Sequence, residues 1–95
     1  MRLIWSESAV HGLIHVRSYI AETDPDAAKK AAGNLLHSAE RLLDFPASGR
    51  AGRVPDTREL VVPGLPFVLP YRVQDEVVVV LAVMHTSRNW PETLE

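Results

Sequence analysis

The sequence predicts an α+β fold with the order β-α-α-β-β-β, in which a helical hairpin covers one face of an antiparallel sheet. The second half of the chain holds three β-branched, apolar runs at Glu59–Val62, Phe67–Val73 and Val77–Val83. The linkers between them are short and contain Gly, Pro and Asp, which favours hairpins over the long crossovers that parallel strands require. The first half carries two stretches with the apolar spacing of helices, and these need a sheet face to cover.

A short first strand is expected at Arg2–Trp5, followed by a helix that the Ser6 hydroxyl caps. This helix should end near Glu22 and Thr23. Its apolar face has spacings of four, three and four residues, at Ala9, Leu13, Val16 and Ile20.

The second helix begins at once, with Asp24 as the cap and Pro25 in the first helical position. It should end at Phe45, because the following proline disfavours helical geometry there. The linker between the two helices is so short that they must pack antiparallel as a helical hairpin. The apolar stripe of the second helix comprises Ala28, Ala32, Leu35, Ala39 and Leu42. Residues 47–56 are expected to form a loop.

The run Val77–Val83 is apolar at every position, which is typical of a strand buried inside a sheet. The first strand is expected at the edge of the sheet or beside this run. Pro70 lies within the preceding strand and has no N–H to donate, so we expect a bulge there or a position where that N–H would face outward.

The chain of 95 residues is expected to form one domain. It has no cysteine, which excludes disulfides and Cys-based zinc sites. His11 and His15 have the spacing of two metal ligands, but no third ligand is evident, so neither a metal nor another cofactor is expected. The net charge of −2 weighs against generic nucleic-acid binding. No run resembles a signal peptide or a membrane span, and we expect a cytoplasmic protein.

Basic and aromatic candidates for a functional site gather in the second half of the chain: Arg50, Arg53, Arg58, Arg72, His85, Arg88 and Trp90. We expect them to bind a target or a partner protein. Arg58 could grip carboxylates or pair with Glu59 or Asp56. Arg50 and Arg53 are either functional or merely solvated on their loop. His85 is either a general base or a cap on the strand end, and Arg72 is expected to point inward and support it.

The arrangement resembles the RelE/ParE superfamily, the toxins of bacterial type II toxin–antitoxin modules. The resemblance covers nearly the whole chain and is most specific at Tyr71-Arg72-Val73 and at His85-x-x-Arg88 followed by Trp90-Pro91. It implies a cognate antitoxin as partner, oligomers only with that antitoxin, and a role in growth inhibition and plasmid stabilisation. Members similar to RelE cut messenger RNA on the ribosome, and members similar to ParE inhibit DNA gyrase.

Members similar to RelE carry basic residues on the second strand, an arginine early in the third, and a base or tyrosine after the fourth. Here the second strand is Glu59–Val62, the third opens with Phe67–Leu69, and no tyrosine follows His85. The sequence is therefore more similar to ParE, with gyrase as the expected target. The alternatives are a ribosome-dependent endoribonuclease using His85, Arg58 and Arg53, and an inactive relative that only binds an antitoxin.

Overall fold

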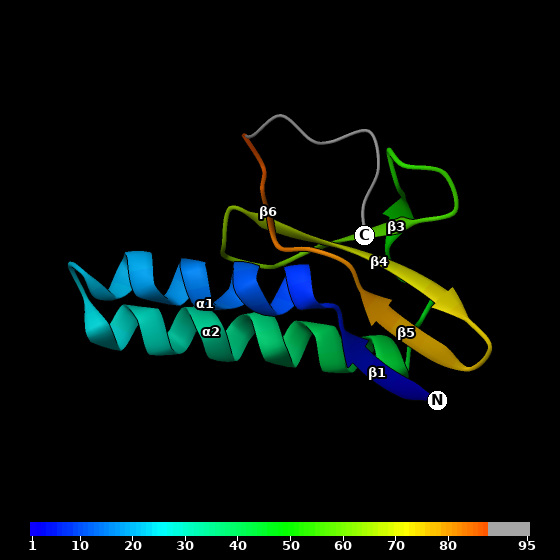
Figure 1. The fold of residues 1–95 in the computed structure, drawn as a ribbon, viewed down its shortest axis with the longest axis horizontal. Helices are drawn as coiled ribbons and strands as arrows, with labels where there is room; N and C mark the ends of the chain where they lie inside the picture. The colour runs from blue at the N-terminus through cyan, green and yellow to red at the C-terminus, as the bar shows by residue number, and fades with distance from the viewer. Residues whose placement is uncertain (88–95) are drawn as a thin grey trace.

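The computed structural model describes residues 1–87 and has the expected order of helices and long strands. Two helices lie side by side along one face of a sheet (Figure 1). The elements are β1 (Arg2–Trp5), α1 (Glu7–Ala21), α2 (Pro25–Glu40), a 3-10 turn η1 (Arg41–Leu43), β2 (Arg50–Ala51), β3 (Arg58–Val61), β4 (Phe67–Gln74), β5 (Val77–Val80) and β6 (Met84–His85).

The sheet has the strand order β1-β5-β4-β3-β2, with β6 also paired to β4. The predicted α+β class is confirmed, but the sheet is mixed, because β1 runs parallel to β5. The antiparallel expectation applies to strands joined by tight turns, whereas the helical hairpin and two β-hairpins separate β1 from β5. β1 lies both at the edge of the sheet and beside the last long strand, as Figure 1 shows at the blue and orange arrows.

Both helices begin at the predicted caps. The Ser6 Oγ accepts a hydrogen bond from the Ala9 N–H at 3.1 Å, and Asp24 Oδ1 accepts one from Ala27 at 3.1 Å. Ala9, Val16 and Leu35 are buried, and with Ala39, Val62, Leu69 and Val80 they form the main core between the hairpin and the sheet. Leu36, in contrast, is 43% exposed. The apolar stripes therefore face the sheet as their spacing predicts.

Pro70 faces an irregular segment of the neighbouring strand. From the pair Tyr71–Val80 to the pair Val68–Met84 there are three residues along β4 but four along the opposite strand. One extra residue is therefore accommodated at Leu81–Val83, and the predicted strand Val77–Val83 is divided into β5 and β6 by this bulge. The expected bulge is present, but on the strand opposite the proline.

A serine compensates for the donor that Pro70 lacks. The Leu81 N–H donates to the Pro70 carbonyl at 2.8 Å, but Pro70 cannot return the bond. The Leu81 carbonyl accepts a hydrogen bond from the Ser6 Oγ at 3.0 Å instead. Ser6 therefore both caps α1 and fixes its first turn against the bulge.

Candidate functional site

A buried carboxylate holds two arginines together at the start of β3. The Glu59 side chain is only 2% exposed, while those of Arg50 and Arg53 are 55% and 47% exposed. Glu59 Oε1 accepts from Arg50 Nε at 3.3 Å and from Nη2 at 3.1 Å. Oε2 accepts from the Arg53 backbone N–H at 2.9 Å and lies 3.5 Å from Arg53 Nε. A buried carboxylate needs such partners, so this loop is fastened to the sheet rather than free in solvent.

A second set of contacts fastens the preceding loop, residues 46–49. The buried Tyr71 hydroxyl donates to the Pro46 carbonyl at 2.8 Å and accepts from the Gly49 N–H at 2.9 Å. Arg58 Nη1 donates to the Gly49 carbonyl at 2.9 Å and to the Ala47 carbonyl at 3.3 Å. A Cβ on Gly49 would lie 2.6 Å from the Tyr71 ring, so the close approach requires glycine there.

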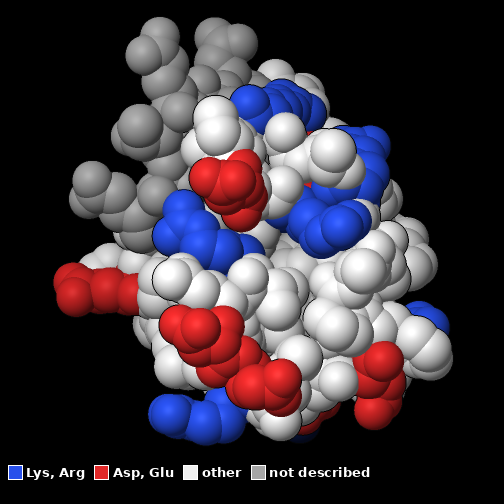
Figure 2. Space-filling view, turned by 90° about the vertical axis from the view of Figure 1, so that its right-hand side faces the viewer, with Lys and Arg blue, Asp and Glu red and all other residues white. Residues whose placement is uncertain are grey.

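Arg58 and Arg72 line one pocket of about 300 Å³ at the end of the β3–β4 ladder. Its remaining lining residues are Ala51, Asp56, Thr57, Tyr71 and Val73. Within residues 1–87, Arg58 and Arg72 form no ion pair. Figure 2 shows that most of the basic side chains on this side of the molecule gather in its upper half, and most acidic ones in its lower half.

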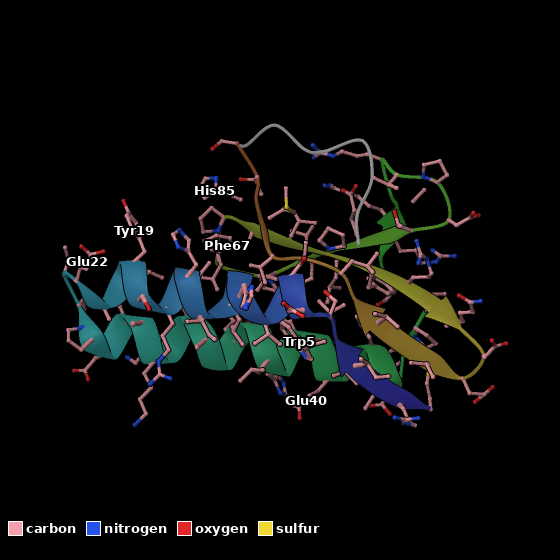
Figure 3. All side chains as sticks on the ribbon, in the orientation of Figure 1. Trp5, Tyr19, Glu22, Glu40, Phe67 and His85 are labelled. Atoms are coloured by element: carbon pink, nitrogen blue, oxygen red, sulfur yellow. The ribbon has the colours of Figure 1, made fainter. Side chains whose placement is uncertain are left out.

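His85 lies at the other end of β4, where β6 pairs with Phe67 and Val68. Its ring packs edge-on against Phe67, with centroids 5.4 Å apart and an interplanar angle of 87°. Figure 3 shows the two labelled side chains next to each other, near the start of β4. The Nδ1 of His85 accepts a hydrogen bond from the Ser87 N–H at 3.1 Å, and the Ser87 hydroxyl lies 2.8 Å from the same nitrogen.

The structure places the described arginine candidates at one end of the β3–β4 ladder and His85 at the other. Arg58 is opposite Tyr71 and His85 is opposite Phe67, so four residues of β4, or about 13 Å, separate them. The expectation that Arg72 supports His85 is wrong, since Arg72 pairs with Val79 and lies still farther along β4. Arg58 also makes neither of its expected carboxylate pairs, because Arg50 and Arg53 occupy Glu59 and Arg58 binds backbone carbonyls. Arg88 and Trp90 lie outside the described residues.

Sequence reasoning missed the two residues that organise this region. Glu59 was interpreted only as a strand residue and a possible partner of Arg58, and Tyr71 only as part of a motif. A signal was available for Glu59, because a lone carboxylate in an otherwise apolar strand is rarely buried without cationic partners. Tyr71 is two residues from the buried Leu69, on the same face of β4. A tyrosine buried there needs polar partners for its hydroxyl.

The described residues, 1–87, contain no cluster of three or more His, Cys, Asp or Glu side chains that could hold a metal ion. In the same residues, no helix is long and apolar enough to cross a membrane.

Comparisons with known proteins agree with this architecture. Residues 3–90 match the family model described as ParE toxin of type II toxin-antitoxin system, parDE. The chain is 39% identical to "Putative toxin Y4kP" of Sinorhizobium fredii, over 98% of this chain and 96% of that protein. It is 31% identical to "Toxin RelE2" of Caulobacter vibrioides, over 92% and 97% of the two chains.

A solved structure titled "Chromosomal ParDE TA system from P. aeruginosa" has the same fold, with a TM-score of 0.84 and 24% identity. The match covers 92% of this chain and 97% of that one. The family model and the two toxin relatives span nearly the whole sequence, with identities well above chance. The chain therefore belongs to the ParE toxin family of type II toxin–antitoxin systems.

Proposed function

We propose that this toxin inhibits growth by binding DNA gyrase rather than by cutting RNA, and that it serves plasmid stabilisation from the cytoplasm. The observation that supports this most strongly is the separation of His85 from Arg58 by about 13 Å along β4. Cleavage through a 2′-hydroxyl needs a base within hydrogen-bond reach and cations on the same phosphate. Arg50 and Arg53 already neutralise Glu59, which leaves less positive charge for RNA.

In this proposal the target is bound by the basic and aromatic candidates of the second half of the chain, namely Arg50, Arg53, Arg58, Arg72, Arg88 and Trp90. His85 contributes packing against Phe67 and a local hydrogen bond rather than proton transfer. The competing proposal, a ribosome-dependent endoribonuclease, is favoured by one observation, the relative named "Toxin RelE2".

Inducible expression in bacteria distinguishes these activities. We expect growth arrest with induction of the DNA damage response, equally for the wild type and for His85→Gln, which cannot act as a base near neutral pH. Primer extension on cellular messenger RNA should show no cleavage at ribosomal A-site codons. Codon-specific cuts that disappear in His85→Gln would overturn the proposal, and a folded protein without any effect on growth would indicate an inactive, antitoxin-binding relative.

A cognate antitoxin should cover apolar surface near the β3 edge. β2 pairs only with Arg58 and Glu59, so the rest of β3 has no neighbour on that side within the described residues. Phe45 and Val61 are 59% and 48% exposed there, beside a pocket of about 320 Å³. Exposed apolar side chains next to an open strand edge favour a docked peptide segment. Copurification with the small protein encoded by the adjacent gene tests this, and absence of any complex would contradict it.

A further inference from the structure

Two histidines form a pair on the exposed face of α1. His11 and His15 lie within the uninterrupted helix Glu7–Ala21, and both are exposed. The core side of the same helix is marked by the buried Ala9 and Val16. A separation of four residues places the two side chains one above the other, with Cβ atoms about 5–6 Å apart. Two imidazoles at this spacing on a helix can bind one zinc ion together.

Neither imidazole of this pair is engaged elsewhere. Within residues 1–87, His11 and His15 make no hydrogen bond, ion pair or ring contact. His85 differs, because its Nδ1 accepts a hydrogen bond from Ser87 and its ring packs against Phe67. A neutral imidazole ligates a metal through the nitrogen that carries no proton. The pair on α1 can therefore bind an ion without breaking any contact of the described fold.

The charges on α1 favour a cation at this place. Apart from histidines, the helix has two ionisable charges, Glu7 and Arg17. Glu7 precedes His11 by four residues and lies on the same side of the helix. Arg17 follows His15 by two residues, which turns it about 200° around the helix axis. The negative charge is thus near the pair and the positive charge is on the opposite side.

A third protein ligand is missing, which sets the affinity rather than excluding the ion. The described part of the chain offers no group of three His, Cys, Asp or Glu side chains. Zn²⁺ is usually tetrahedral, and water can fill the positions that protein ligands leave open. Structural sites with four protein ligands bind zinc very tightly, and half of that free energy corresponds to a dissociation constant of about 1–200 µM.

We propose that His11 and His15 together bind one Zn²⁺ ion through their imidazole nitrogens, with water completing the coordination. The site lies on α1, apart from the arginine region and from the β3 edge assigned to the antitoxin, and it does not depend on the target of the toxin. Because the ion connects successive turns of α1 in the folded chain, it should also stabilise the fold.

Nuclear magnetic resonance titration of the untagged, isotopically labelled full chain with zinc chloride tests the proposal. At about pH 7.5 a histidine side chain is mostly neutral and able to ligate. We expect saturable shifts of the His11 and His15 ring signals with one ion per chain. His15→Gln should weaken binding at least about tenfold, since one of the two ligands is lost. The matched control, His37→Gln, removes a lone exposed histidine of α2 and should leave the affinity unchanged.

Thermal unfolding supplies a second measurement. Zinc at about 1 mM should raise the unfolding midpoint of the wild type and of His37→Gln by several degrees, and that of His15→Gln much less. Equal zinc affinity of the wild type and His15→Gln would overturn the proposal. So would shifts centred on His37 or His85, or the absence of saturable binding up to about 1 mM zinc.

Discussion

The two ends of β4 are built by different means, although they belong to one strand. At the arginine end, Glu59, Tyr71 and Arg58 fasten the loops with side-chain hydrogen bonds. At the His85 end, within the described residues, the His85 side chain makes only a ring contact with Phe67 and local hydrogen bonds with Ser87, while the Thr86 N–H donates to the Pro66 carbonyl at 2.9 Å. A network of buried polar groups fixes geometry, so the arginine end is the more preorganised of the two.

The two ends of β4 also differ in backbone strain. The turn before β4, near His85, places Gly64 at φ 77°, where glycine is unstrained. At the arginine end, the left-handed positions are occupied by Asp56, Asp75 and Glu76, with φ of 63°, 52° and 63°. Such residues cost free energy and are found preferentially at functional sites. The left-handed residues at the arginine end are therefore more strained than Gly64 near His85.

The largest expected effect is that of Glu59→Ala. It leaves two arginines and the Arg53 N–H without their buried acceptor, and since both arginines can regain water, we expect unfolding free energy to fall by about 2–3 kcal/mol. Glu40→Ala, at an exposed carboxylate, should change it by less than about 0.5 kcal/mol. Urea unfolding of both variants measures the difference, and equal midpoints would remove the distinction between the two ends.

Tyr71→Phe should cost somewhat less, about 1–2 kcal/mol, because the buried Gly49 N–H and the Pro46 carbonyl lose their partner while the ring packing remains. The matched control is Tyr19→Phe, whose hydroxyl belongs to a side chain that is 71% exposed. Thermal unfolding followed by circular dichroism gives both values. A Tyr71→Phe variant as stable as the control would mean that the hydroxyl does not fix the 46–49 loop.

Much of the fold could be predicted from the sequence, because helix caps, apolar spacing and hairpin linkers act locally. Ser6, Asp24 and the Pro63-Gly64 turn all occupy the positions that their chemistry indicates. The parallel pairing of β1 could not be predicted, since it depends on packing between segments far apart in the chain.

The candidate site was predicted less well. The cluster of arginines was found, but not the fact that Glu59 already binds Arg50 and Arg53. The separation of His85 from Arg72 depends on the strand register and on the bulge, and no local sequence motif predicts either of them.

Glu76→Gly should raise stability by about 0.5–1 kcal/mol, because glycine adopts the observed positive φ without steric cost and part of the gain is lost to unfolded-state entropy. The same substitution at Glu40, where the backbone is helical with φ −60° and ψ −32°, should lower stability instead. Chemical denaturation measures both signs. A loss of stability in Glu76→Gly would indicate that the arginine end is not strained.

His85→Gln should have the smallest effect, less than about 0.5 kcal/mol on stability, because the half-buried ring makes few polar contacts. Thermal unfolding checks this value beside that of Tyr71→Phe. If His85→Gln lowered the free energy of unfolding by more than Tyr71→Phe does, the His85 end would contribute more to stability than the arginine end.

The most direct test of the proposed mechanism is a supercoiling assay with purified toxin, purified DNA gyrase and relaxed plasmid, run beside a ribosome-dependent messenger RNA cleavage assay. We predict that the wild type and His85→Gln inhibit supercoiling to the same extent and leave messenger RNA intact. Normal supercoiling at a large molar excess of folded toxin, together with messenger RNA cleavage that requires His85, would contradict the account.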